Sequence, residues 1–190
     1  MNIIQIGCHM GNDHVYDLVS KKECNQIILI DANPYVLEIC KNKYKDVPNV
    51  TFLNYAIIPK YLNNKFIKFY IPKNDKTSAH CSVSLEFIQK HNHFEWIEQD
   101  VPCITLNNLL NQMNINTINK LYIDAEGLDA EIILSLDLMQ YNIEYIYFES
   151  THSDGPFTKN INLKNVILKL KEFNYELIND DQFNLGFIKK

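Results

Sequence analysis

The chain has 190 residues, of which 46% are hydrophobic and 22% charged, and its formal net charge is −5 at neutral pH. This length fits one domain with a sizeable core, and no apolar run reaches the roughly 18–20 residues that a membrane-spanning helix needs. All 18 basic residues are lysines. Because arginine is the usual residue for bidentate recognition of bases and phosphates, the composition argues against nucleic acid as a substrate.

Cysteine usage and the first residues bear on location. The five cysteines are scattered without a CxxC pair, and the N-terminal segment has no basic or signal-like region. Reduced thiols are the better interpretation of such a pattern. We therefore expect an intracellular, cytoplasmic protein with no membrane partner, while the oligomeric state is left open.

Short apolar segments alternate with amphipathic segments in the first third of the chain. Strands are predicted at residues 3–6, 27–30 and 50–53. Asn12 or Asp13 can cap a helix after the first strand, and Asn33 followed by Pro34 predicts the start of a second helix. Such alternation is typical of a parallel sheet covered on both faces.

The middle of the chain is less regular. Residues 66–71 alternate with period two and predict a strand, whereas residues 72–100 are polar and predict an irregular, mobile loop over the active site. Residues 101–104 predict a further short strand. A helix is then predicted from the apolar spacing of Leu106, Leu109, Leu110 and Met113.

Regular alternation returns in the last third. Strands are predicted at 121–123 and 145–148, helices after 127 and over 163–173, and a terminal hairpin at 175–178 and 185–188. We predict one domain over 1–190, an α/β, Rossmann-like, doubly wound and mostly parallel seven-stranded sheet with a C-terminal antiparallel hairpin. This is the order of the class I S-adenosylmethionine (SAM) methyltransferase fold. The inserted segment of about 64–104 is expected to cover the acceptor side.

A glycine turn and an acid follow the first two predicted strands. Gly7 and Gly11 form a GxxxG pattern that contains His9, and Asp31 lies twenty residues beyond Gly11. Glycines let a backbone approach a ligand, and this spacing suits an acid that binds ribose hydroxyls. The pattern predicts an adenosine cofactor without separating SAM from NAD. The alternative is a tight turn alone, with Asp31 as a helix cap, although Asn33 already fills that role.

The loop after the third strand is Asn54-Tyr55-Ala56. In a doubly wound sheet this loop borders the adenine pocket, as does Ala32 after the second strand. Tyr55 can stack on the base and Asn54 can form a hydrogen bond nearby. An ordinary strand end with an aromatic core residue is the alternative.

Acidic residues gather after the predicted strands at 121–123 and 145–148. Asp124, Glu126, Glu149 and His152 would meet at the carboxyl edge of the sheet and form the candidate reaction centre. The alternative is that Asp124 and Glu126 only complement a helix dipole. A divalent cation held by Asp124, Glu126 and Glu149 is compatible with this grouping but not required. A zinc site among His80, Cys81, His91 and His93 matches no common spacing.

Five segments together resemble the FkbM family of SAM-dependent methyltransferases. They are residues 6–11 (IGCHMG), 29–34 (LIDANP), 104–110 (ITLNNLL), 121–127 (LYIDAEG) and 148–149 (FE). The most specific one is similar to the family signature K-I-D-x-E-G-x-E, with Tyr122 in place of lysine. Asn107 replaces the usual Asp, and His9 the usual Asn. The resemblance implies SAM as cofactor and O-methylation of a small-molecule or glycan acceptor.

The resemblance also implies roles at the site. The turn from Gly7 to Gly11 would cradle the methionine end of SAM, Asp31 would bind the ribose, and Tyr55 or Ala56 would line the adenine. Asp124 would face the sulfonium or the acceptor, with Glu126, Glu149 or His152 as base or acceptor ligand.

Three rival functions stay open. An RNA ribose 2′-O-methyltransferase is disfavoured by the acidic chain and by Glu149 where a lysine is usual. A non-catalytic SAM-binding or scaffold protein would not need Glu126 and Glu149. A nicotinamide-dependent dehydrogenase is disfavoured by the GxxxG turn and the terminal hairpin.

Overall fold

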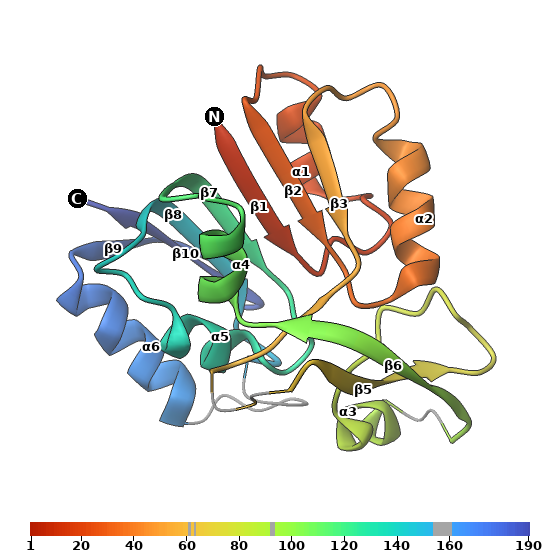
Figure 1. Cartoon of the computed structure of the whole chain (residues 1–190). Helices are drawn as coiled ribbons and strands as arrows, with labels where there is room; N and C mark the ends of the chain where they lie inside the picture. Colours follow the sequence, from red (N-terminus) through yellow and green to blue (C-terminus); the bar gives the residue numbers. More distant parts are fainter. Residues whose placement is uncertain (61, 63, 92–93, 154–160) are drawn as a thin grey trace.

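A seven-stranded sheet forms the centre of the protein in a computed structural model that describes residues 1–60, 62, 64–91, 94–153 and 161–190 (Figure 1). Its strand order is β3-β2-β1-β7-β8-β10-β9. The first five are parallel, and β10 pairs antiparallel with both β8 and β9. The bounds are β1 Asn2–Ile6, β2 Gln26–Ile30, β3 Val50–Leu53, β7 Thr117–Ile123, β8 Asn142–Glu149, β9 Tyr175–Asp180 and β10 Asn184–Lys189. The predicted fold class is confirmed.

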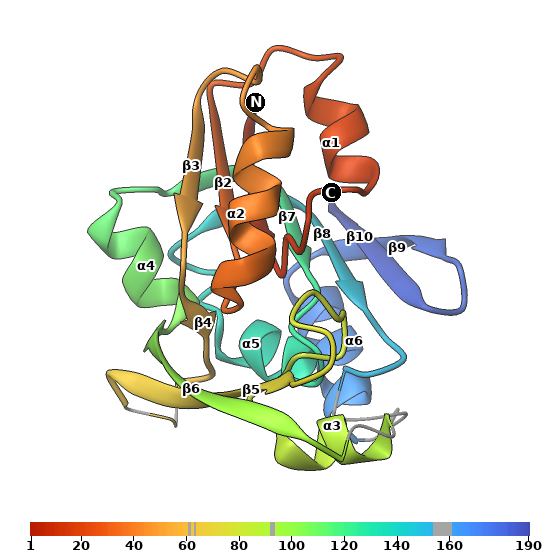
Figure 2. The ribbon, with the colours of Figure 1, turned by 90° about the vertical axis from the view of Figure 1, so that its right-hand side faces the viewer.

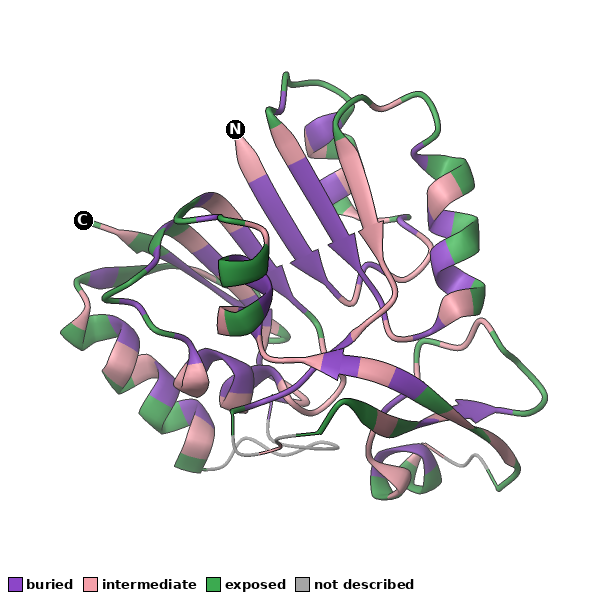
Figure 3. Ribbon diagram, in the orientation of Figure 1, coloured by how far each residue is buried: buried purple, intermediate pink, exposed green. Residues whose placement is uncertain are grey.

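The two faces of this sheet carry different helices, because side chains alternate along each strand. Residues such as Ile3 and Ile27 pack against α1 (His14–Val19) and α2 (Pro34–Lys43). Residues such as Ile4 and Ile28 pack against α4 (Leu106–Gln112), α5 (Asp129–Ser135) and α6 (Ile161–Glu172). The central strands are therefore buried on both sides (Figure 3). Within the described residues, no helix has the length and apolar character needed to span a membrane.

Polar side chains fix where the first two helices begin. The Asp13 carboxylate accepts hydrogen bonds from the backbone amides of Val15 and Tyr16, so Asp13 rather than Asn12 caps α1. The Asn33 side chain accepts from the amide of Tyr35 and caps α2, as predicted. Both caps start a helix after the loop that follows a strand of the parallel sheet.

A second sheet of order β4-β6-β5 lies across the carboxyl ends of the central strands (Figure 2). Its strands are β4 Ala56–Ile57, β5 Phe66–Pro72 and β6 Trp96–Ile104, and helix α3 (Leu85–Lys90) adjoins it. The prediction of an irregular loop over 72–100 is therefore wrong in part, since this range contains α3 and the start of β6. Residues 96–100 have polar side chains on an exposed face, which hid the strand, and antiparallel pairing with β5 defines it.

Lys169 of α6 caps the neighbouring helix α5. Its ammonium donates hydrogen bonds to the carbonyls of Ile133, Leu134 and Leu136, at 3.0, 2.9 and 2.5 Å. These carbonyls lie at the end of α5, where helical partners are lacking. We expect Lys169→Met to lower the free energy of unfolding by about 2 kcal/mol, measured by urea denaturation. Lys171→Met, at an exposed position of the same helix, should change it by less than about 0.5 kcal/mol. Equal effects would contradict the capping role.

Candidate active site

The carboxyl ends of β1, β2 and β7 converge at the glycine turn. The amides of Gly7 and Cys8 both donate to the Ile30 carbonyl of β2, at 2.8 and 3.1 Å, and the amide of Asp124 donates to the Ile6 carbonyl at 3.0 Å. Gly7 has a φ of +74°, which favours glycine. Chain order reverses on the two sides of β1, so this is the switch point at which open α/β sheets bind ligands.

A cavity of about 400 Å³ opens at this switch point. Eight of the predicted site residues line it: Gly7, His9, Asp31, Ala32, Tyr55, Ala56, Asp124 and Glu126. From the second sheet and its loops, Phe69, Ser78, Ala79, Cys81 and Val83 line the opposite side. The cavity thus lies between the central sheet and the inserted segment.

Four predicted site residues do not line this cavity. Gly11 faces α2, because a Cβ built on it would lie 2.6 Å from Cε2 of Tyr44. The side-chain amide of Asn54 donates to the backbone carbonyls of Asp31 and Ala32, at 2.8 and 3.0 Å, and so holds the loop after β2. Glu149 and His152 adjoin Glu126 on the far side of the cavity wall.

Asp31 ties the glycine turn to the start of α2. Its two carboxylate oxygens accept hydrogen bonds from the amides of His9 and Asn33, both at 2.8 Å. Burial raises the pKa of Asp31, and these two amides oppose that shift. Since each carboxylate oxygen can accept two hydrogen bonds, the side chain can still accept hydrogen bonds from the hydroxyl groups of a ligand in the cavity.

His9 connects the turn to the inserted segment. Its backbone has a φ of +46°, and its Nε2 lies 2.8 Å from the carbonyl oxygen of Thr77. The side-chain amide of Asn33 likewise donates to the backbone carbonyl of Lys76 at 2.9 Å. These two contacts hold residues 76–77 against the glycine turn and the start of α2, directly before Ser78, which lines the cavity.

The cavity-lining residues that the sequence prediction missed include Gln5, Asp13, His14, Tyr122, Tyr147 and Asn184. The Gln5 amide donates to the Asp13 carboxylate at 2.6 Å, and the His14 ring lies 5.1 Å from the rings of both Tyr122 and Tyr147. Gln5 is the one polar residue inside an otherwise apolar strand segment, a signal that could have found it. To predict that Tyr122 and Tyr147 line the cavity, one would need to know which face of the sheet meets it.

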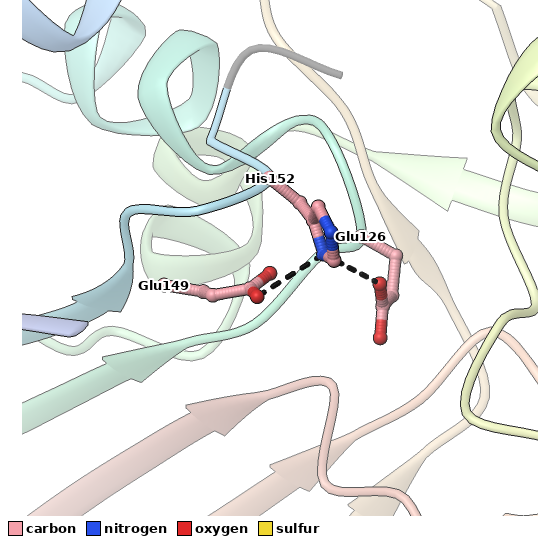
Figure 4. Close-up of side chains that lie close together, drawn as sticks. All are labelled: Glu126, Glu149 and His152. Atoms are coloured by element: carbon pink, nitrogen blue, oxygen red, sulfur yellow. Dashed lines mark ion pairs between the residues drawn. The ribbon is translucent and has the colours of Figure 1, made fainter. Parts of the chain in front are cut away.

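The acidic side of the site joins Glu126, Glu149 and His152 (Figure 4). His152 Nδ1 lies 3.1 Å from Glu149 Oε1 and 3.8 Å from Glu126 Oε2. Burial and the charge of Asp124 raise the pKa of Glu126 to about 10 and that of Glu149 to about 8. The pKa of Asp124 itself rises to about 6 through desolvation and Asp31, although the cavity leaves this side chain accessible.

Among the residues that the structure describes, His80, Cys81 and His91 do not form a group with metal-ligand spacing. The His80 ring stacks on His91 with centroids 4.3 Å apart, and His91 Nδ1 lies 2.8 Å from the Phe87 carbonyl oxygen. His93 lies outside the described residues. Within the described part of the chain, the group with metal-ligand spacing is Glu126, Glu149 and His152, so His152 joins the two glutamates in place of Asp124.

The sheet order and the antiparallel C-terminal pair are those of class I SAM methyltransferases. The sequence profile of the methyltransferase FkbM domain matches residues 5–177, and the chain therefore belongs to the FkbM methyltransferase family. The resemblance expected from the sequence motifs is confirmed. No curated protein matches the chain.

Solved structures share this fold at low identity. An FkbM methyltransferase from Methylobacillus flagellatus is 11% identical with a TM-score of 0.59, over 98% of this chain and 43% of its own. The chain thus spans less than half the length of that relative. A methyltransferase from Podospora anserina with bound S-adenosylhomocysteine (SAH) has a TM-score of 0.52 at 11% identity, over 100% and 71%. A precorrin-6y C5,15-methyltransferase from Geobacter metallireducens has a TM-score of 0.50 and 11% sequence identity. The match covers 100% of this chain and 80% of that one.

Proposed function

We propose that the chain is a SAM-dependent methyltransferase that methylates a hydroxyl oxygen of a small-molecule or glycan acceptor. The charge of the cavity is the observation that carries the choice of cofactor. Its acidic lining residues are Asp13, Asp31, Asp124 and Glu126, and within the described chain no lysine lines it. SAM carries a sulfonium and an ammonium group, whereas a nicotinamide dinucleotide carries two phosphates. An acidic cavity favours the positively charged groups of SAM over the phosphates of a nicotinamide dinucleotide.

The proposed cofactor position follows the polarity of the cavity. The backbone turn at Gly7 borders the methionine end, the Asp31 carboxylate accepts from the ribose hydroxyls, and Tyr55 with Ala56 flanks the adenine. Asp124 faces the sulfonium. Gly11 shapes the turn and Asn54 holds the Asp31 loop, so these two residues act by positioning their neighbours.

Methyl transfer is an in-line displacement. A lone pair of the acceptor oxygen forms a bond to the methyl carbon, the carbon–sulfur bond breaks, and its electron pair stays on sulfur, which leaves as the neutral thioether of SAH. The hydroxyl proton passes to His152, because burial lowers the pKa of its imidazole, whereas the raised pKa values of Glu126 and Glu149 keep these two side chains protonated. His152 adjoins Glu126, which lines the cavity. Alignment of the reactants and general base catalysis are the terms that the protein supplies.

The same charges argue against an RNA acceptor. Nucleic-acid grooves need lysines or arginines along the phosphate path, while this chain has a net charge of −5 and no arginine. The inserted segment of about 64–104, which forms one wall of the cavity, is proposed as the acceptor-side cover.

The cofactor is tested by calorimetry with SAM, SAH and NAD⁺. We expect SAM and SAH to bind with Kd values of about 1–100 μM, equivalent to about −8 to −5.5 kcal/mol, and NAD⁺ to bind at least about 10-fold more weakly. Tighter binding of NAD⁺ would contradict the proposed cofactor.

The acceptor is tested by SAH formation with sugars, glycans, hydroxylated small molecules and RNA. We expect turnover with a hydroxylated sugar or small molecule. Turnover with RNA alone would contradict the proposed acceptor class, and SAM binding without turnover on any member of the panel would favour a non-catalytic SAM-binding protein.

A further inference from the structure

Three side chains beside the cavity offer one ligand atom each, and these atoms all lie within 4.8 Å of one another. We infer that Glu126, Glu149 and His152 form a binding site for a divalent transition-metal cation of the Mn²⁺ class. The site adjoins the acceptor end of the cavity. Its role in methyl transfer rests on the proposed function, whereas cation binding stands by itself.

The fold brings the three ligands together from two neighbouring strands. Glu126 lies in the loop after β7, Glu149 is the last residue of β8, and His152 follows three residues later. Because β7 and β8 are parallel neighbours, their carboxyl ends meet at the same edge of the sheet. The three side chains point toward one another (Figure 4) and are 14–21% exposed, so they are largely enclosed, and Glu126 connects them to the cavity that it lines.

The backbone holds Glu126 in an uncommon conformation. Its φ is +47°, in the left-handed region that a residue with a Cβ rarely adopts. The Ser82 hydroxyl donates to the Glu126 carbonyl at 3.0 Å, which fastens this loop to the inserted segment. A strained backbone held from outside the loop is typical of positions where a side chain must be aimed at a ligand.

The charges around the site call for a cation. Asp124 and Asp129 accompany the two glutamates, and Asp129 is fully buried. In the described residues, one oxygen of Asp129 and one of Glu149 are buried without a hydrogen-bond partner, and no lysine pairs with any of the four carboxylates. Buried carboxylates are costly unless a positive charge or a metal compensates them.

The donor set selects the class of metal. Two carboxylate oxygens and one imidazole nitrogen suit Mn²⁺, Fe²⁺ or Co²⁺ better than Mg²⁺ or Ca²⁺, which prefer oxygen ligands alone. Three protein ligands leave positions open on an octahedral ion. A hydroxyl that filled one of them would become more acidic, as a metal-bound water does. An acceptor with two adjacent oxygens, such as a sugar diol, can fill two of them.

Titration of the full chain with Mn²⁺ tests the site, with free Mn²⁺ followed by electron paramagnetic resonance. We expect one ion per chain with a Kd of about 10–100 μM, and at least about 10-fold weaker binding in Glu149→Gln and His152→Phe, a loss of about 1.4 kcal/mol or more. Glu144→Gln, at an exposed position of the same strand β8, is the matched control and should bind as the unchanged chain does.

SAM calorimetry on the same samples separates this inference from the proposed function. We expect the variants to bind SAM within about threefold of the unchanged chain, because neither residue lines the cofactor cavity. SAM binding without stoichiometric Mn²⁺ binding would overturn the metal site and leave the proposed function standing. Equal Mn²⁺ affinity in the unchanged chain and in both ligand variants would also overturn it.

Discussion

Replacing Asp31 with alanine is expected to weaken SAM binding about 100-fold, a loss of about 2.7 kcal/mol. The reason is the loss of charge-assisted hydrogen bonds to the two ribose hydroxyls, each contributing about 1.5 kcal/mol or more. Calorimetry with adenosine and 2′,3′-dideoxyadenosine isolates that contact. The unchanged chain should prefer adenosine, because the dideoxy compound lacks the 2′- and 3′-hydroxyls that donate to the Asp31 carboxylate. Asp31→Ala should lose this preference.

The control for Asp31 is a variant that disturbs the same loop without touching the cavity. Asn54→Ala removes the two hydrogen bonds to the Asp31 and Ala32 carbonyls, at 2.8 and 3.0 Å. It should lower the free energy of unfolding by about 1–2 kcal/mol and keep the preference for adenosine. If Asp31→Ala also keeps that preference, its carboxylate serves only to join the amides of His9 and Asn33, and the ribose role is wrong.

Sequence patterns predicted the central sheet because its inner strands contain largely apolar segments. Segments such as Ile27–Ile30 are apolar throughout, as expected for strands covered on both faces, and caps such as Asn33 mark where helices begin. Residues 96–100 lack that signal, because only one of their faces packs. Their strand exists through pairing with β5, which is a tertiary contact that local patterns do not contain.

The candidate site was predictable where chemistry lies at a strand end. Asp31 and Asp124 follow buried strands, and the topology of a doubly wound sheet brings such positions to one edge. Tyr147 lies beside Tyr122 in the register between β7 and β8, and Asn184 lies opposite Glu149 in the register between β8 and β10. Their approach to the cavity depends on these pairings, which local patterns do not contain. The contact of His152 with Glu126 also depends on the path of the chain after β8, which no spacing rule fixes.

Replacing Gly7 with alanine should damage folding and cofactor binding together. The φ of +74° is strained for any residue with a Cβ, and that atom would lie 1.8 Å from the carbonyl oxygen of Asp124. The obstacle is backbone on the neighbouring strand end, so relief requires β1 and β7 to separate. We expect the free energy of unfolding to fall by about 4 kcal/mol. With an m-value of about 2 kcal/mol per M, the urea midpoint should fall by about 2 M.

Gly11→Ala provides the comparison, because the two glycines differ in what a Cβ would meet. At Gly11 the φ is +70°, nearly the same, but the nearest atom is Cε2 of the Tyr44 side chain at 2.6 Å. A side chain can shift where a strand end cannot, so the expected loss is smaller, about 2 kcal/mol. Equal losses at both positions would mean that the positive φ alone sets the cost. The contact between Gly7 and the Asp124 carbonyl would then not be what keeps the two strand ends, and the cavity between them, in place.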